Sequence, residues 1–122
     1  MILMSKTNII QLSEFDVTQK IIESLTNVCT RTVLFAIKDE AKDATKISEE
    51  LNISQSTVYK TLSQLEELAL IEVDKFIFSS GKKIKLYKSR IAQVNILIKD
   101  TEPVLELYPN ENISKNNSTF VE

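Results

Sequence analysis

The 122-residue sequence contains no histidine, a single cysteine (Cys29), a single glycine (Gly81) and two prolines. A single cysteine excludes a disulfide framework and is consistent with a reducing cytoplasm. Without histidine the chain cannot form a Ser–His or Cys–His catalytic pair, and it lacks the commonest general base. With one glycine it also has no glycine-rich loop to hold the phosphates of a nucleotide. We therefore predict that this protein is not an enzyme.

Long apolar runs are also missing from the sequence. No run approaches the length of a membrane span, and the opening MILM is too short and wrongly flanked for a signal peptide. A chain of this length can bury one core but not two. We expect a cytoplasmic protein built on one main domain.

The net charge of the chain is small, but basic and acidic residues are unevenly distributed along it. The formal net charge is −2, which is unusual for a protein that binds nucleic acid. Residues 75–99, however, contain seven basic side chains and no acidic one, whereas residues 18–74 and 100–122 each carry a net charge of −4. A charge run is usually only a solvated face. The position of this one, directly after the motif described next, points to a nucleic-acid partner.

Residues 44–73 have the pattern of a helix, a tight turn, a second helix and the start of a strand. Thr45 is placed to cap the first helix, and Ser54 can cap the second through its hydroxyl. Asn52 suits the left-handed position that closes a helix. Two helices joined by so short a turn must cross steeply, which is the helix-turn-helix arrangement.

The second helix of this motif, residues 54–68, has an apolar and a polar face. At about 100° per residue, Val58, Leu62, Leu65 and Ala69 fall on one stripe, which we assign to the core. An outward polar face is common to all amphipathic helices, but these polar groups can also hydrogen-bond base edges and phosphates. If this is a recognition helix, the residues that enter the major groove are Gln55, Ser56, Thr57, Tyr59, Lys60 and Ser63.

After this helix, the spacing of apolar residues changes from the 3.6-residue period of a helix to the two-residue period of a strand. Residues 71–78 and 83–88 alternate as two strands, with Gly81 in a turn where a positive φ is often needed. The alternation places Val73, Lys75 and Ile77 on one face and the two phenylalanines, Phe76 and Phe78, on the other. A helix-turn-helix followed by such a hairpin is a winged helix.

The wing of such a fold normally lies along the phosphate backbone. Lysines at a hairpin tip also protect an edge strand from aggregation. We favour phosphate binding because the basic residues continue past the tip to Lys88 and Arg90, which makes residues 75–90 a basic wing. The predicted backbone contacts come from the wing lysines Lys82, Lys83 and Lys85, with additional contacts from Thr45, Lys46 and Arg31.

Two helices are predicted before the motif, and the segment after it fits two kinds of secondary structure. The first helix is expected to begin after Asp16 as its cap and to end near Asn27, and the second to cover Thr30–Ala41. Residues 91–108 fit both a strand and a helix pattern. Their β-branched residues and the turn region 99–103 favour a second hairpin, whose return strand ends at Pro109.

Three segments resemble one family of regulators. They are LTNVCTRTVL (25–34), ISEELNISQSTVYKTL (47–62) and LEELALI (65–71). They resemble winged-helix transcriptional regulators of the arsenic-repressor-like (ArsR-like) group, and in particular its archaeal members. In that group a glycine commonly occupies the place of Ala69. The resemblance implies a homodimer on a two-fold symmetric site in double-stranded DNA, and often a small effector or a metal.

The metal of that group is not expected here. Its metal sensors place cysteines on the first motif helix, and residues 46–51 contain none. Cys29 alone cannot build a thiolate site, and there is no histidine to complete one. We predict no metal and no cofactor.

The sequence therefore predicts an α+β, mainly α, fold. A winged helix-turn-helix (18–90) follows an N-terminal arm (1–17) and precedes a C-terminal β-hairpin (91–109) and a flexible tail (110–122). The predicted function is sequence-specific DNA binding by a homodimeric transcriptional regulator. The alternative is a winged-helix protein–protein interaction module of the transcription or replication machinery, with the arm and the acidic residues 100–111 as its partner surface.

Overall fold

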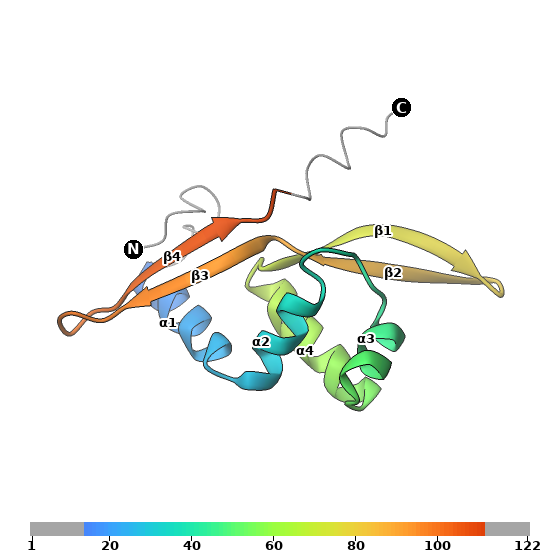
Figure 1. Ribbon diagram of the computed structural model, residues 1–122, viewed down its shortest axis with the longest axis horizontal. Coiled ribbons are helices and arrows are strands. Elements are labelled where there is room, and N and C mark those ends of the chain that lie inside the picture. The colour runs from blue at the N-terminus through green and yellow to red at the C-terminus, as the bar shows by residue number, and fades with distance from the viewer. Residues whose placement is uncertain (1–13, 112–122) are drawn as a thin grey trace.

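The computed structural model describes residues 14–111, in which four helices are followed by four strands. The helices are α1 (Glu14–Leu25), α2 (Val28–Ala36), α3 (Ala44–Leu51) and α4 (Gln55–Glu67), and the strands are β1 (Ile71–Ser79), β2 (Lys82–Ser89), β3 (Ile91–Leu97) and β4 (Val104–Pro109). The two hairpins β1–β2 and β3–β4 follow each other along the length of the molecule, with the helices on one side of them (Figure 1). This confirms the predicted α+β winged-helix fold. Within the described residues, no helix is long and apolar enough to cross a membrane.

The first helix starts earlier than the sequence pattern indicated. Asp16, predicted as its cap, lies inside α1, and residues 14–17 belong to this helix and not to an arm. The reason is that Val17 extends the stripe of Ile21 and Leu25 by one turn, and all three are buried in the core. The rest of the predicted arm, residues 1–13, lies outside the described residues.

The second helix is displaced toward the N-terminus relative to the predicted range 30–41. The Asn27 side chain accepts a hydrogen bond from the Thr30 backbone N–H at 3.0 Å, which caps α2 before Val28. At its other end the helix stops at Ala36, so Ala41 lies outside it. Lys42 then exchanges two backbone hydrogen bonds with Tyr87 of β2, at 2.9 and 3.1 Å. This bridge holds the loop before α3 against the wing.

The helix-turn-helix is closed by its capping residues. Asn52 adopts the predicted left-handed conformation, with φ 57° and ψ 48°, and Ser54 caps α4 by accepting from the Thr57 N–H. The cap of α3 is Asp43, which accepts from the Lys46 N–H at 2.8 Å. Thr45, predicted as that cap, lies in the first turn of the helix because Asp43, two residues earlier, has the extended backbone that a cap needs.

A single apolar core joins the helices to both hairpins. On α4, Val58, Leu62 and Leu65 are buried as predicted. Ala69, predicted to continue this stripe, lies beyond the end of α4 and has a positive φ of 61°. The core is completed by residues of the other elements, namely Val17, Ile21, Leu25, Val33, Leu34, Ile37, Ala44, Ile47, Leu70, Ile71, Tyr87, Ile91, Leu105 and Leu107.

The β1–β2 hairpin contains a bulge that changes which side chains share a face. Its turn uses two positive φ values, 53° at Ser80 and 77° at Gly81, which suits a two-residue hairpin turn. The register shifts between Val73 and Lys75, so that Asp74 is the extra residue of β1. Beyond the bulge, Phe76 lies opposite Lys85 and Phe78 lies opposite Lys83. The prediction that Val73 shares a face with Lys75 is therefore wrong.

The second hairpin forms as predicted from residues 91–108. Strands β3 and β4 pair antiparallel, with Ile96 opposite Leu105 and Val94 opposite Leu107. Its end is fixed by Asn110, whose Nδ2 donates to the Lys38 carbonyl at 2.8 Å and to the Ser89 carbonyl at 3.0 Å. Asn110 is buried, so it belongs to the folded domain and not to the predicted tail. Residues 112–122 lie outside the described residues.

Candidate nucleic-acid interface

The outward face of α4 carries a row of exposed polar side chains. The residues predicted to enter the major groove are all exposed on this helix, namely Gln55, Ser56, Thr57, Tyr59, Lys60 and Ser63. The Oγ1 of Thr57 accepts a hydrogen bond from Ser54 Oγ at 2.9 Å. The hydroxyl of Thr57 is therefore part of the helix cap as well as of the outward face.

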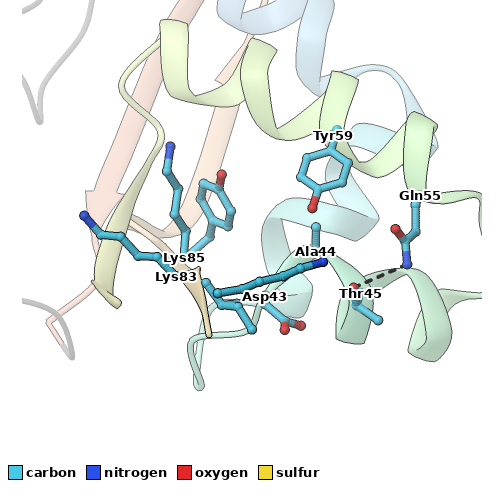
Figure 2. A pocket seen from close by; sticks show the side chains of 10 residues that line it. Asp43, Ala44, Thr45, Gln55, Tyr59, Lys83 and Lys85 are labelled. Atoms are coloured by element: carbon cyan, nitrogen blue, oxygen red, sulfur yellow. Dashed lines mark hydrogen bonds between the residues drawn. The ribbon is translucent and has the colours of Figure 1, made fainter. Parts of the chain in front are cut away.

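A groove of about 670 Å³ separates this face from the wing. Figure 2 shows Tyr59 and Gln55 on the helix side of the groove, and Lys83 and Lys85 on the wing side. Gln55 Nε2 donates to Thr45 Oγ1 at 3.3 Å, which links the first turn of α4 to the first turn of α3. The groove is lined by Asp43, Ala44, Thr45, Gln55, Tyr59, Lys82, Lys83, Ile84, Lys85 and Tyr87.

Three of the wing lysines are available to an outside partner. Lys82, Lys83 and Lys85 are exposed, and within residues 14–111 none of them forms an ion pair with a carboxylate. The ammonium of Lys83 lies 4.2 Å from the centre of the Phe76 ring. These three cations line one side of the groove, so it can attract an anion such as a phosphate.

The two basic residues nearest the core have structural roles instead. Lys88 is buried, and its Nζ donates to the Asp39 carbonyl at 3.2 Å. Arg90 donates to the Ala69 carbonyl at 3.0 Å and lies 3.8 Å from a Glu72 carboxylate oxygen. The continuation of basic residues past the hairpin tip therefore does not support phosphate binding, because Lys88 and Arg90 are used within the fold.

The remaining predicted backbone contacts lie in two different places. Thr45 and Lys46 are exposed at the start of α3, beside the groove. The Lys46 Nζ is 3.9 Å from Glu50 Oε2 and 4.0 Å from Glu40 Oε2, so carboxylates already surround it. Arg31 instead donates to the Leu25 carbonyl at 2.9 Å and lines a second groove.

That second groove, of about 340 Å³, lies between α1, α2 and β3. It is lined by apolar side chains together with Arg31 and one threonine. None of these residues lines the groove between α4 and the wing, which we call the wing groove. The structure therefore does not bring Arg31 together with the other predicted contacts. The residues that line this groove are Leu25, Thr26, Arg31, Phe35, Val94 and Ile96.

Two ionisable groups near the wing groove have shifted pKa values. The Lys42 ammonium, hydrogen-bonded to Glu50 at 2.7 Å, lowers the pKa of that carboxyl below its ordinary 4.5. Burial raises the pKa of Tyr87, and the nearby Glu66 and Tyr59 add to this effect. The Tyr87 phenol at the wall of the groove therefore stays neutral over the physiological range.

Sequence reasoning missed Asp43 and Tyr87 as groove residues. Asp43 was a candidate, since it is as good a helix cap as Thr45 and lies two residues before it. Lys83, Lys85 and Tyr87 are spaced two residues apart along β2, which places Tyr87 on the same face as the two lysines. Within residues 14–111, no three acidic or cysteine side chains group closely enough to hold a metal ion.

Comparison with known proteins points in the same direction as this geometry. Residues 32–88 match the family described as "Sugar-specific transcriptional regulator TrmB". An uncharacterized HTH-type transcriptional regulator of Methanocaldococcus jannaschii is 29% identical over 89 residues, which cover 73% of this chain and 90% of that protein. The matched family segment runs from α2 to β2 and so contains the helix-turn-helix and the wing. These similarities support a helix-turn-helix transcriptional regulator.

Proposed function

We propose that this protein is a sequence-specific DNA-binding transcriptional regulator that works as a homodimer on a two-fold symmetric site. The observation that carries the proposal is the groove between α4 and the wing, which has exposed hydrogen-bonding groups on one side and, on the other, three lysines that form no ion pair within residues 14–111. Helix α4 would enter the major groove, and the wing would follow the phosphate backbone beside it.

In this arrangement the residues divide between base and backbone contacts. The amide of Gln55 suits adenine, because an amide can donate and accept at the N7 and N6 edge, and Lys60 suits the acceptors of guanine. Both lie on the exposed face of α4. Lys82, Lys83 and Lys85 would hold phosphates, which fixes position but reads no sequence. Thr45 and Lys46 would add phosphate contacts from the start of α3.

A dimer surface is proposed on the side of the molecule away from the wing. The first helix and residues 91–108 are the candidates, and the apolar groove between α1, α2 and β3 lies on them. A second copy packed there would leave α4 and the wing free. The two copies of α4 would then need a spacing of about 34 Å to read successive major grooves. Arg31 would belong to this surface more readily than to the DNA contact.

The finer identity of the regulator stays a prediction. The ArsR-like grouping and a small effector are both proposed from the resemblance of residues 25–71. The sugar in the description of the matched family is not carried over to this chain, since the match at residues 32–88 covers the elements proposed to bind DNA.

The proposal is tested by measuring DNA affinity against salt concentration. Each lysine that neutralises a phosphate adds close to one unit to the slope of log affinity against log salt. We expect Lys82→Ala and Lys83→Ala each to lower this slope by about one unit. Lys38→Ala is the matched control, because Lys38 is a half-exposed lysine after α2, outside the wing and the segments proposed for the dimer surface, and should change nothing. If Lys82→Ala and Lys83→Ala leave affinity and slope unchanged, the phosphate role of the wing is wrong.

A gel-shift assay separates this function from the protein–protein interaction module. The probe is the promoter region of the protein's own gene, tested at low salt, where phosphate contacts are strongest. A retarded complex supports the regulator, and its absence favours the module. Chemical cross-linking of the free protein decides between a monomer and a dimer.

A further inference from the structure

Two phenylalanines on the wing are exposed to solvent in a way that the phosphate-binding role does not explain. Phe78 is 75% exposed and Phe76 is 45% exposed. Both lie in the half of β1 where every side chain is exposed, so they do not contribute to the core. A large apolar ring held in water on a hairpin indicates a surface that is covered in a complex.

The two-residue turn of the hairpin determines the surroundings of these rings. With this turn, Phe78 lies directly opposite Lys83 and Phe76 directly opposite Lys85. Residues that are opposite in an antiparallel pair share a face, so the two rings and two ammonium groups form one surface. The Lys83 ammonium lies over the Phe76 ring at 4.2 Å, in contact with its π face.

We propose that Phe78 is an apolar wedge that enters the DNA minor groove and inserts between two base pairs, with Phe76 behind it. This inference rests on the proposed function, since it assumes that α4 lies in the neighbouring major groove. The lysines beside the rings would hold the phosphates on the two walls of the minor groove. Insertion of a side chain of this kind unstacks a base step and bends the duplex.

Charge and shape both favour DNA as the partner of this surface. Residues 75–99 contain no acidic side chain, so the part of the wing that carries the rings contributes only basic charges to this surface. A protein partner would need a matching acidic surface, whereas the minor groove offers base faces between two rows of phosphates. The opposite face of the hairpin carries Ile77 paired with Ile84, which has no such alternation of ring and cation.

The length of the wing is sufficient for this contact. Strand β1 has nine residues, which at about 3.3 Å each span roughly 30 Å. The minor groove beside a recognition helix lies half a helical turn away, or about 17 Å along the duplex. The tip of the wing projects beyond the helices (Figure 1), so the ring of Phe78 can reach that groove.

The first test compares Phe78→Ala with wild type on a duplex that wild type has selected from a random-sequence pool. A neutral ring releases no counterions, so its loss should lower the affinity without changing the salt slope. We expect about tenfold weaker binding at every salt concentration, from the loss of one base-stacking contact. Energy transfer between dyes at the two ends of the duplex should also show a smaller bend.

Val28→Ala is the matched control for this variant. Val28 is 65% exposed at the start of α2, so it is similarly apolar, and it lies outside the wing and the segments proposed for the dimer surface. Its affinity and bend should equal those of wild type. Unchanged affinity and bend in Phe78→Ala would overturn the wedge, and so would a loss of affinity accompanied by a lower salt slope.

The second test places a reporter at the wedge itself. The chain contains no tryptophan, so Phe78→Trp introduces a single tryptophan, whose fluorescence is distinguishable from that of the three tyrosines, and keeps an aromatic ring at this position. We expect Phe78→Trp to bind the duplex as tightly as wild type, and its fluorescence to be strongly quenched by the adjacent bases. Val28→Trp is the control and should keep its fluorescence in the complex. Tight binding with unquenched fluorescence at position 78 would overturn the inference.

The outcomes separate this inference from the function on which it rests. If wild type binds the duplex but Phe78→Ala leaves affinity and bend unchanged, or Phe78→Trp stays unquenched in the complex, the wedge is wrong and the proposed regulator function stands. If wild type selects no duplex from the pool, the proposed function and the wedge are both wrong.

Discussion

Ala69 shows how much one residue can matter at the junction of α4 and the wing. It has a φ of 61°, in the left-handed region where a side chain is strained, and its carbonyl accepts a hydrogen bond from Arg90. Ala69 therefore holds a backbone conformation that glycine adopts without strain.

We predict that Ala69→Gly stabilises the protein by about 0.5–1 kcal/mol, because glycine removes the strain but gives the unfolded chain more freedom. The measurement is the midpoint of urea unfolding. Ala92→Gly is the control, since Ala92 lies in β3 and is not among the positive-φ residues, and it should destabilise the fold. A lower midpoint for Ala69→Gly would contradict the prediction.

The capping residues show where single-residue reasoning reaches its limit. Asp43 and Thr45 are both good helix caps, and the sequence alone offered no means to choose between them. Asn52 and Ser54 were predictable because the turn between two helices is short and leaves few alternatives. Asp74 is a further case: its Oδ1 is buried without a hydrogen-bond partner in the described part of the chain, which no pattern in the sequence indicated.

At the scale of elements, one ion pair connects α3 to the loop that holds the wing. Lys42 forms the backbone bridge to Tyr87, and its ammonium lies 2.7 Å from Glu50 of α3. The pKa of Glu50 is lowered mainly by this hydrogen bond. A lowered carboxyl pKa in the folded state means stability that is present above the ordinary pKa of 4.5 and is lost as the pH falls through the lowered value.

We therefore predict that Glu50→Gln reduces the acid sensitivity of the fold. The variant should be less stable than wild type at neutral pH, and this difference should shrink at pH values below 4.5, where wild-type Glu50 becomes protonated. Urea midpoints measured across this range check the prediction. The control is Glu49→Gln, because Glu49 is an exposed neighbour with no ion pair in residues 14–111. A constant difference at all pH values would contradict it.

The second hairpin is the element that the sequence left most open. Residues 91–98 fit a helix as well as a strand, because their apolar residues satisfy both periods. In the folded chain, only Arg90 separates β2 from β3, and Leu105 and Leu107 of β4 are buried in the core. Burial against the helices, which is a non-local effect, selects the strand.

At the scale of the whole molecule, Asn110 joins parts of the chain that are far apart in sequence. Its amide donates to the carbonyl of Lys38 after α2 and to that of Ser89 at the end of β2. The second hairpin is thus locked to both the helical part and the wing.

We predict that Asn110→Ala destabilises the fold by about 1–3 kcal/mol, since it leaves buried carbonyls without these donors. The measurement is again urea unfolding, in which all elements should lose stability together. Gln93→Ala is the control, because the exposed Gln93 amide donates only to a neighbouring surface residue, Asn95. Equal midpoints for the two variants would show that Asn110 has no special role.

Basic and acidic residues are unevenly placed over the described part of the molecule. The basic wing lies at one end and the second hairpin, with Asp100, Glu102 and Glu106, at the other (Figure 1), while residues 18–74 carry a net charge of −4. A net charge of −2 hides this separation. On DNA, repulsion of the acidic end by phosphate would help to orient the proposed complex with its wing toward the duplex.

The sequence by itself determined the helix-turn-helix, the wing and the outward polar residues of α4, because these follow from local periods and caps. Only the tertiary structure decided which basic residues are free and which support the core, as Lys88 and Arg90 do. It also moved Arg31 to a different groove and, through the bulge at Asp74, separated Val73 from the face of Lys75. The physical reason is that strand register and burial depend on contacts between distant residues, which no local pattern contains.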